Sequence, residues 1–364
     1  MITNDFPPNP GGIENYVFSL VRRWPAGEVV VVTRAMPGSA EFDSGLDFEV
    51  IREPVDTLLP KPQLARRMVA LAADRGVDVV HFPSALPLGL MGAGLGVPYA
   101  VSVHGGEFLL ASRLPASRSL LKSVCRRAAV MLPESSFAES LVARLVGPST
   151  PMERVTCGVD ADRYAPGAAE PVDLGLDGPV VVSVSRLVAR KGPRTLVKAM
   201  PRVLASRPDA HLLIVGGGPD FDHVSGMVAA AGLGGSVTMA GAQPWDRIPS
   251  FLAAARIFAL PTRARFFGTE TEGLPLVYVE GAAAGLPLIG GDAGGVRDAV
   301  RPGQTGILVD GSKPEQTSRA ILQLLDDPEE AARLGAAGRE MVLKEFTWDA
   351  VFGTYRRALK ACVG

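Results

Sequence analysis

Short apolar runs alternate with longer helical patterns along the whole chain. In the first part the runs are rich in valine and about five residues long, which is typical of strands buried on both faces of a parallel sheet. They cover residues 28–34, 48–52, 77–82, 99–103 and 129–133. The second part repeats the pattern at residues 180–185, 211–216, 236–240, 257–261, 287–290 and 306–309. This rhythm predicts an α/β protein with two parallel sheets, each covered by helices on both faces.

A segment rich in proline, glycine and alanine separates the two series of strands. It covers residues 165–179 and is typical of an interdomain linker. We therefore predict an N-terminal domain over residues 1–160 and a second domain over residues 161–348, each long enough to bury its own core. A final helix is predicted within residues 349–364.

The first strand of the N-terminal sheet is unusually short. Only Met1 and Ile2 precede the polar residues Thr3, Asn4 and Asp5, whereas a central strand needs five or six apolar residues. A truncated central strand would leave backbone groups of its neighbours unpaired. We therefore expect the native start to lie a few codons upstream of Met1, and mass spectrometry of the native N-terminus tests this.

Composition narrows the class of protein. The 37 basic and 38 acidic residues nearly balance, which argues against a nucleic-acid-binding protein. Three widely spaced cysteines favour a reducing compartment and no metal site. The start lacks the pattern of a signal peptide. Prolines and glycines interrupt the uncharged stretch over residues 82–103, which is therefore predicted to be a loop, a short helix and a strand instead of a membrane span.

Candidate binding chemistry follows two strands of the second domain. Arg186 and Lys191 come directly after the strand at residues 180–185, at the entry to the next helix. The strand at residues 257–261 leads into a loop and then a helix near Pro275, and two carboxylates, Glu272 and Glu280, flank that turn. Fixed cations at a strand end, with a helix N-terminus nearby, predict a diphosphate site. The alternative for the two glutamates is a solvated helix surface.

A set of ordered motifs resembles a known family. The motifs are S-R-L-V-A-R-K-G at residues 185–192, E-G-L-P-L-V-Y-V-E at 272–280, N-D-F-P-P-N-P-G-G-I at 4–13, H-G-G-E at 104–107, C-G-V-D at 157–160, I-V-G-G-G-P at 214–219 and F-T-W at 346–348. Their order resembles that of the retaining glycosyltransferases of family 4, which have the GT-B fold. Within the family, the motifs look most like those of actinobacterial GDP-mannose-dependent mannosyltransferases that extend phosphatidylinositol mannosides.

The resemblance implies an architecture and a set of partners. It implies two Rossmann-like domains that face each other across a cleft, the first binding an acceptor and the second a nucleoside diphosphate sugar. The last helix is expected to cross back onto the first domain. The acceptor would be lipid-linked or a saccharide, and the sugar a hexose, by resemblance mannose. No cofactor or metal is expected, and the sequence contains no His/Cys cluster with ligand spacing.

The resemblance also assigns roles to residues. The expected catalytic residues are His104, Arg186, Lys191 and Glu272. The expected donor-binding residues are Gly12, Gly217, Met239, Gly241, Gln243, Gly273, Leu274, Pro275, Leu276 and Glu280. The expected acceptor-binding residues are Asn4, Asp5 and Glu107. Where the family has glycine-aromatic-glycine, this chain has Gly273-Leu274-Pro275, which keeps backbone donors but changes the pocket wall.

His104 stands out among the four histidines. It ends a predicted strand before two glycines that we expect to be flexible, at the edge of a parallel sheet where ligands bind. The other three, His81, His211 and His223, are predicted to be structural or uninvolved. The loop over residues 263–271 carries two arginines and two phenylalanines, and it is either an anionic head-group contact or a mobile surface loop.

Five basic residues and no acidic residue lie between Arg113 and Arg127. Leucines and a valine are interleaved with them, so a helix here would present cationic and apolar surface together. One interpretation is a solvated cationic face. The other is a surface that rests on anionic lipid, which would make the protein cytoplasmic and peripheral on the inner face of the plasma membrane.

Two other functions fit parts of the pattern. A sugar-nucleotide epimerase of the same fold would use the same diphosphate site, and a catalytically inactive regulatory subunit would bind nucleotide without transfer. A nicotinamide enzyme is disfavoured because the glycine run at residues 216–218 departs from G-x-G-x-x-G at Phe221. Release of free nucleoside diphosphate separates a transferase from an epimerase.

Overall fold

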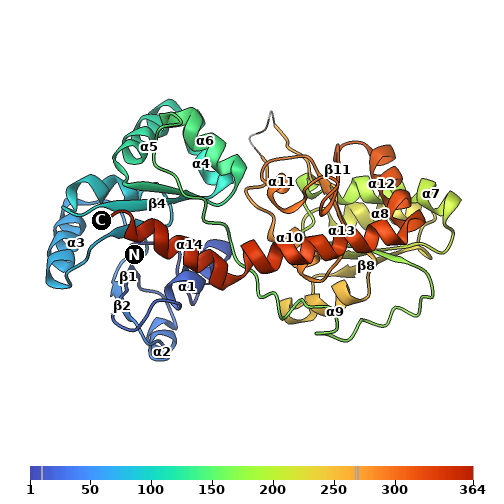
Figure 1. Ribbon diagram of the computed structural model, residues 1–364, viewed down its shortest axis with the longest axis horizontal. Helices are drawn as coiled ribbons and strands as arrows, with labels where there is room; N and C mark the ends of the chain where they lie inside the picture. The colour runs from blue at the N-terminus through green and yellow to red at the C-terminus, as the bar shows by residue number, and fades with distance from the viewer. Residues whose placement is uncertain (10, 267, 269, 364) are drawn as a thin grey trace. The chain divides into compact units, whose positions relative to one another are not determined.

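The computed structural model describes residues 1–9, 11–266, 268 and 270–363. The chain divides into two compact units (Figure 1). Unit 1 comprises Met1–Gly158 and Trp348–Gly364, and unit 2 comprises Val159–Thr347. Unit 1 is therefore assembled from both ends of the chain.

Unit 1 is an α/β unit with parallel strands. Its elements are α1 (Gly12–Val21), β1 (Val30–Arg34), α2 (Ser39–Asp43), β2 (Glu49–Glu53), α3 (Pro62–Asp74), β3 (Val80–Phe82), the 3₁₀-helix η1 (Leu88–Gly94), β4 (Tyr99–Val103), α4 (Gly105–Arg113), α5 (Pro115–Arg127), β5 (Val130–Pro133), α6 (Ser136–Val146) and α14 (Trp348–Lys360). Strands β1 and β2 pair with each other, and β3, β4 and β5 form a second ladder.

The first three residues of the chain lie between these two ladders. Ile2 bridges to Val32 of β1, and its amide donates to the His81 carbonyl of β3. The resulting spatial order is β2, β1, residues 1–3, β3, β4 and β5. The order reverses between residues 1–3 and β3, and ligands bind at such a reversal in open parallel sheets, at the carboxyl ends of the strands.

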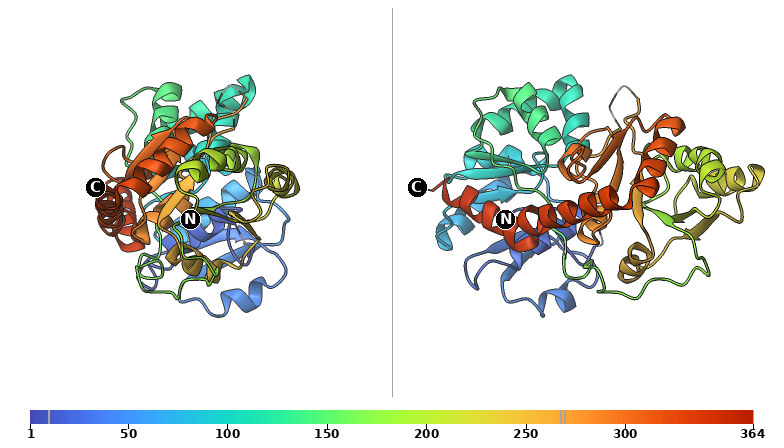
Figure 2. Two further views of the ribbon diagram at one scale, coloured as in Figure 1. Left: turned by 90° about the vertical axis from the view of Figure 1, so that its right-hand side faces the viewer. Right: turned by 45° about the vertical axis from the view of Figure 1, so that its right-hand side comes forward.

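Helix α14 completes unit 1 from the far end of the sequence. It packs against α1, and the red end of the ribbon accordingly lies beside blue segments (Figures 1 and 2). The Tyr355 hydroxyl lies 2.8 Å from His81 Nδ1, and the Trp24 ring meets Phe352 edge-on at 5.4 Å. His81 Nε2 in turn contacts the Ser102 hydroxyl at 2.8 Å. Both ring nitrogens of His81 thus have protein partners, which confirms its structural role.

Unit 2 has the same architecture with a longer sheet. Its elements are β6 (Val180–Val184), η2 (Ala189–Lys191), α7 (Pro193–Ser206), β7 (His211–Val215), α8 (Phe221–Ala230), β8 (Val237–Gly241), η3 (Trp245–Arg247), α9 (Ile248–Ala253), β9 (Ile257–Leu260), α10 (Leu276–Ala283), β10 (Leu288–Gly291), α11 (Val296–Ala299), β11 (Gly306–Val309), α12 (Pro314–Asp326), α13 (Pro328–Met341) and the π-helical turn η4 (Val342–Phe346). The described strands form one parallel sheet in the order β11, β10, β9, β6, β7, β8.

Alternate residues of the central strands feed two separate cores of unit 2. Val182 of β6 and Phe258 of β9 pack with α9 and α10, while Val181 and Ala259 pack with α7, α8 and α12. Both faces of the sheet are therefore buried, as the continuous apolar runs predict. The sheet order reverses between β6 and β9, so the segments that follow these two strands meet at the reversal point.

The predicted strands are all present, with ends that shift by a few residues. Pro275 is the N-cap residue of α10, close to where a helix was predicted. Two local expectations were wrong. Gly105 and Gly106 begin helix α4 and do not form a flexible turn. The helix expected across residues 113–127 is divided at Leu114, whose extended backbone is favoured by the following Pro115. Among the described residues, we find no helix that is both long and apolar enough to cross a bilayer.

Candidate active site

The reversal point of unit 2 brings Lys191 to the end of β9. Lys191 closes the short turn η2 after β6, and Gly192 follows with φ of 74°. A Cβ atom at Gly192 would lie only 2.1 Å from the Pro261 carbonyl oxygen. Glycine is thus required both for the left-handed backbone and for close approach to the β9 segment. This approach places Lys191 next to the loop that precedes α10.

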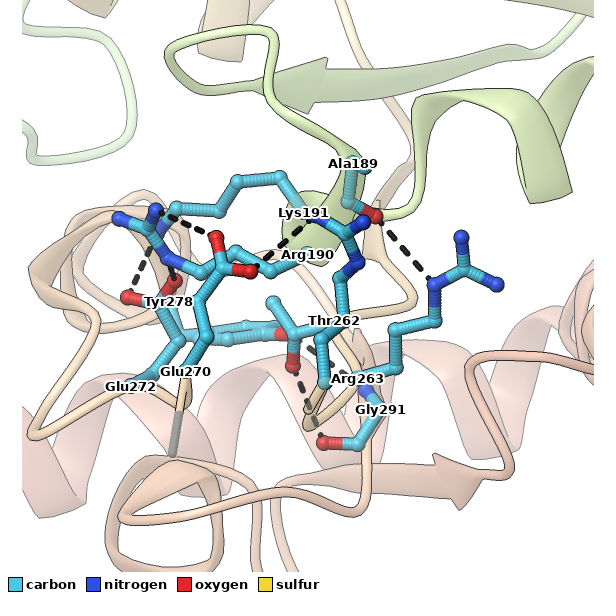
Figure 3. A network of polar contacts seen from close by, with 10 residues as sticks. Ala189, Arg190, Lys191, Thr262, Arg263, Glu270, Glu272, Tyr278 and Gly291 are labelled. Atoms are coloured by element: carbon cyan, nitrogen blue, oxygen red, sulfur yellow. Dashed lines mark hydrogen bonds and ion pairs between the residues drawn. The ribbon is translucent and has the colours of Figure 1, made fainter. Parts of the chain in front are cut away.

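Glu272 is the partner of Lys191 across this junction (Figure 3). Its Oε2 lies 2.9 Å from Lys191 Nζ, and its Oε1 accepts a 2.7 Å hydrogen bond from Arg190 Nε. Burial alone would raise the pKa of Glu272, but Lys191 and Arg190 outweigh burial and hold the pKa below its usual value. Glu272 is therefore an ionised, enclosed carboxylate and not a solvated surface residue.

The ion pairs extend beyond Glu272 into the preceding loop. Arg190 Nη1 also approaches Glu270 Oε1 at 3.5 Å, and Arg265 pairs with the other oxygen of Glu270 at 3.1 Å. The amide of Arg263 donates to the Arg190 carbonyl at 2.8 Å. These contacts attach the loop after β9 to the turn η2. Arg190 was not among the predicted site residues, although its place beside Lys191 in the same turn was a usable signal.

Arg186 occupies the first position after Ser185 at the end of β6. Its side chain is exposed, and it makes no ion pair or hydrogen bond with the described residues. The neighbouring Ser185 hydroxyl is buried and also has no partner in that part of the chain. A cation and a hydroxyl at a strand end are thus available to a ligand.

Helix α10 carries Glu280, the second glutamate of the predicted pair. Burial raises the pKa of Glu280, with the Tyr164 hydroxyl and Arg163 acting in the opposite direction. The expected donor-binding segment Gly273, Leu274, Pro275 and Leu276 leads into this helix. Since the first amides of a helix lack intrahelical acceptors, the start of α10 offers N–H donors close to Glu272.

Three glycines end β7 and bring its loop against β6. Gly216 and Gly218 have φ values of 140° and 146°, and Cβ atoms there would lie 1.8 Å from the Ser185 carbonyl oxygen and 2.5 Å from that of Leu187. Gly217 lies between them at the same edge of the sheet. The expected base-binding residues end the next strand: Met239 packs partly into the core, Gly241 has φ of 68°, and Gln243 Nε2 donates to the Ala240 carbonyl at 2.6 Å.

In unit 1, His104 follows β4 and is the N-cap residue of α4. Its Nδ1 lies 2.8 Å from Glu134 Oε2, and the Tyr16 ring packs edge-on at 5.3 Å. Burial by itself would lower the pKa of His104, but the hydrogen bond and charge of Glu134, with smaller contributions from Glu107 and the Pro83 carbonyl, raise it above its ordinary value. Glu134, which follows β5 thirty positions after His104, was not among the predicted site residues.

The expected acceptor residues lie at the same edge of unit 1. Burial first, and then the carboxylates of Glu14 and Glu107, raise the pKa of Asp5, while His104 acts in the opposite direction. Glu107 accepts a 2.7 Å hydrogen bond from the Ser84 hydroxyl. The amide group of Asn4 both donates to and accepts from the backbone of Leu58, at 3.1 and 2.7 Å, and so also holds the segment around Leu58.

Gly12 begins α1 and is exposed, with open space where a Cβ would point. Beside it, the Glu14 carboxylate folds back over Gly11, so that a Cβ at Gly11 would lie 1.9 Å from Glu14 Oε2. Glu14 also accepts a hydrogen bond from Asn9 at 3.0 Å. A carboxylate thus lies at the start of α1, beside the expected donor-binding residue Gly12.

Two pockets accompany these sites. One of about 450 Å³ in unit 2 is lined by Thr262, Arg263, Arg265, Asp292 and Asp310. It adjoins the loop expected to recognise an anionic head group, of which residues 267 and 269 lie outside the described part. The other, of about 700 Å³, lies in unit 1 at the amino ends of β1, β2 and β3. That is the edge opposite the one where parallel sheets bind ligands, so it is not part of the site.

Comparisons with known proteins agree with this architecture. Residues 10–163 match the family model described as Glycosyltransferase Family 4, and residues 169–341 match Glycosyl transferases group 1. The chain is 37% identical over 366 residues to the GDP-mannose-dependent alpha-(1-6)-phosphatidylinositol monomannoside mannosyltransferase of Mycolicibacterium smegmatis, covering 96% of this chain and 94% of that protein.

Two further matches extend the comparison. A monoacylated alpha-(1-6)-phosphatidylinositol monomannoside mannosyltransferase from Corynebacterium glutamicum, also GDP-mannose-dependent, is 37% identical, with 96% of this chain and 94% of that protein covered. Among solved structures, Anabaena HepE in complex with UDP superposes with a TM-score of 0.80 at 19% identity, covering 99% of both chains. At that identity the match shows the fold alone.

The fold is that of the GT-B class, and the family models and the similar curated proteins define a glycosyltransferase. The chain belongs to the glycosyltransferase family whose N-terminal part is described as family 4 and whose C-terminal part is described as group 1. It is an enzyme that transfers sugar, and the comparisons favour this activity over the epimerase and the regulatory subunit.

Proposed function

We propose that this enzyme transfers mannose from GDP-mannose to a phosphatidylinositol mannoside, with retention of the anomeric configuration. The observation that carries the proposal is the likeness to GDP-mannose-dependent mannosyltransferases over 96% of the chain. The site in unit 2 supports the chemistry, because its cations are suited to a nucleoside diphosphate leaving group.

The charges at the end of β6 account for donor activation. Breaking the glycosidic bond places negative charge on the departing diphosphate and positive charge on the sugar. Arg186, Lys191 and the amides at the start of α10 are groups whose attraction for the diphosphate grows as that charge develops. Because these groups can neutralise the diphosphate, we expect transfer to proceed without a metal ion, and activity in the presence of a chelator tests this.

Glu272 couples donor binding to sugar recognition. In the free protein its carboxylate is held by Lys191 and Arg190. A diphosphate that pairs with these cations competes with Glu272, which becomes available to accept hydrogen bonds from sugar hydroxyls. By family resemblance, Glu280 is then expected to bind the ribose, and His104 to contact the transferred sugar.

Helices α4 and α5 present a surface suited to a lipid acceptor. Leu110, Leu114 and Leu120 are exposed at 58%, 56% and 47%. The basic residues along the same segment are Arg113, Arg118, Lys122, Arg126 and Arg127. We infer that this surface, which we call the basic-leucine surface, holds the enzyme on an anionic membrane at its cytoplasmic side. Each basic residue near such a membrane contributes about 1 kcal/mol.

A transfer assay tests the proposed function directly. Purified enzyme is incubated with phosphatidylinositol monomannoside and one donor at a time, which is GDP-mannose, UDP-glucose or ADP-glucose. We expect GDP release and a lipid product heavier by one hexose only with GDP-mannose, and the coupling constants of the new anomeric centre should show retention. Lys191→Ala provides the inactive control. Consumption of GDP-mannose without GDP release, or transfer from another donor alone, would contradict the proposal.

A further inference from the structure

Glu134 holds His104 and the start of α4 at the same time. Its two carboxylate oxygens contact different groups. Oε2 lies 2.8 Å from His104 Nδ1, and Oε1 accepts a 3.1 Å hydrogen bond from the Gly105 amide. Gly105 is the first residue of α4. One side chain from the end of β5 therefore fixes both the imidazole ring and the backbone turn that carries it.

This arrangement leaves only the other ring nitrogen for a ligand. With Nδ1 committed to a carboxylate, Nδ1 must carry a proton, and the state of Nε2 decides whether the ring is neutral or charged. Nε2 is buried. The Pro83 carbonyl acts on the ring and raises its pKa, but no described residue makes a hydrogen bond of normal geometry to Nε2. A buried polar atom without a partner is unfavourable, so such an atom in a binding site indicates a place for a ligand oxygen.

The charges around the ring favour the imidazolium form. Glu134 follows β5, Glu107 lies on α4, Asp5 follows the first segment, and Tyr16 on α1 contributes its ring edge. His81 of β3 also interacts with His104, and burial keeps His81 neutral. Glu14 and Arg34 act on Asp5 from the neighbouring elements. Among the described residues, the charged side chains that raise the pKa of His104 are the carboxylates of Glu134 and Glu107. A charged donor binds an oxygen more strongly than a neutral donor.

We propose that Glu134 is a positioning residue that keeps His104 charged, so that His104 Nε2–H donates a hydrogen bond to an oxygen of the bound substrate. The identity of that substrate rests on the proposed function, but the effect of Glu134 on His104 does not. In a neutral ring with the proton on Nδ1, Nε2 would be an acceptor. It would then receive a hydrogen bond from a substrate hydroxyl and could not donate one to a substrate oxygen.

The first test measures the charge of His104 without any substrate. The chain has only four histidines, so the imidazole NMR signals of the full-length enzyme can be assigned with His104→Asn. We expect the titration midpoint of His104 to lie above its ordinary value and to fall by about 1–3 pH units in Glu134→Gln, because one opposite charge is removed. The matched control is Glu139→Gln, which removes an exposed carboxylate of α6 that pairs with Arg154.

The second test separates positioning from a structural role. In Glu134→Gln, transfer at pH 7.5 should fall at least about tenfold and should recover as the pH is lowered toward the new midpoint of His104. A merely structural role predicts the same loss at every pH. An unchanged midpoint or a pH-independent loss would overturn the proposal. If the variant does not fold, the wild-type titration decides, since a His104 midpoint below its ordinary value would also overturn it. Absence of transfer by the wild-type enzyme would refute only the proposed function.

Discussion

Lys191 Nζ lies 2.9 Å from Glu272 Oε2, and the two side chains expose only 12% and 11% of their surface. In the proposed donor site of unit 2, the charges of Lys191 and Glu272 are therefore paired with each other. Removing one member of an enclosed ion pair leaves the other charge without compensation. Under the proposed function the donor exchanges this ion pair for contacts of its own. Loss of Glu272 and loss of Lys191 should therefore change nucleotide binding in opposite directions, although both should reduce transfer.

Replacing Glu272 should strengthen nucleotide binding while it weakens transfer. In Glu272→Gln the cations of Lys191 and Arg190 lose their internal partner, so GDP should bind more tightly by calorimetry. Transfer should nevertheless fall by about 100- to 1,000-fold, because a group that acts on the sugar in the transition state is lost. Glu345→Gln, in the ion pair with Arg301 elsewhere in unit 2, is the control. Weaker GDP binding would show that Glu272 does not compete with the diphosphate.

Replacing Arg186 and replacing Lys191 should have different effects on the stability of the fold but similar effects on the rate of transfer. Arg186 is exposed, so Arg186→Ala should leave the free energy of unfolding within about 0.5 kcal/mol of wild type. Lys191→Ala leaves Glu272 with one partner fewer and should lower the unfolding temperature. Transfer should fall by about 100- to 1,000-fold in each. Lys198→Ala, at an exposed position of α7, should change neither quantity.

Arg190 should matter through the loop that it attaches. Arg190→Gln removes the guanidinium that bridges Glu272 and Glu270, so we expect the KM for the donor to rise by about five- to thirtyfold, which corresponds to 1–2 kcal/mol. Limited proteolysis should detect faster cleavage within residues 263–271. Arg207→Gln removes a comparable ion pair with Asp326 and serves as the control. Equal KM values would contradict this role.

Two histidines of unit 1 should give opposite dependences of stability on pH. Burial holds the pKa of His81 well below 6.5, so the unfolded chain binds a proton that the folded chain does not, and His81 destabilises the fold as the pH falls below about 6.5. The raised pKa of His104 contributes stability below about 6.5 that is lost as the pH rises through its folded value. We expect to see this in unfolding temperatures measured from pH 5 to 8. In His81→Gln the unfolding temperature should fall less than in wild type as the pH is lowered below about 6.5, and in His104→Asn it should fall less than in wild type as the pH is raised above about 6.5.

The basic-leucine surface should bind anionic vesicles. We expect the enzyme to sediment with phosphatidylglycerol vesicles but not with phosphatidylcholine vesicles, and added salt should reduce the binding. Leu114→Ser should weaken it, whereas Leu59→Ser, at a position of unit 1 that is 45% exposed, should not. Equal sedimentation of both variants would place the membrane contact elsewhere.

The sequence predicted the strands well and the ends of helices poorly, for different reasons. Runs such as residues 180–184 are buried on both faces, so their apolar residues are continuous and distinctive. Helix ends depend on local backbone geometry. The break at Leu114 was readable from Pro115, whereas a helix that starts on Gly105 and Gly106 contradicts their low helix propensity and is set by Glu134.

Residues of the candidate site could be predicted where they lie in a sequence motif. Contacts between side chains that are far apart in the sequence were harder to predict. Lys191 and Glu272 each lie in a recognisable motif, but that they form an ion pair across 81 positions is a property of the fold. Glu134 lies between a strand and the Ser135 cap of α6, where an acidic residue has an ordinary explanation as a turn residue. Glu134 can be recognised as the partner of His104 only from the fold, because His104 follows β4 and β4 pairs with β5.

The division of unit 1 between the two ends of the chain affects how the enzyme is made. Tyr355 of α14 satisfies His81, which lies 274 positions earlier in the chain. During synthesis on the ribosome, the first 158 residues emerge long before helix α14. Until α14 is made, the Trp24 side chain lacks its contact with Phe352. Unit 2 is translated without interruption and can complete its fold first. A premature stop near the C-terminus would therefore damage the half of the enzyme that was synthesised first.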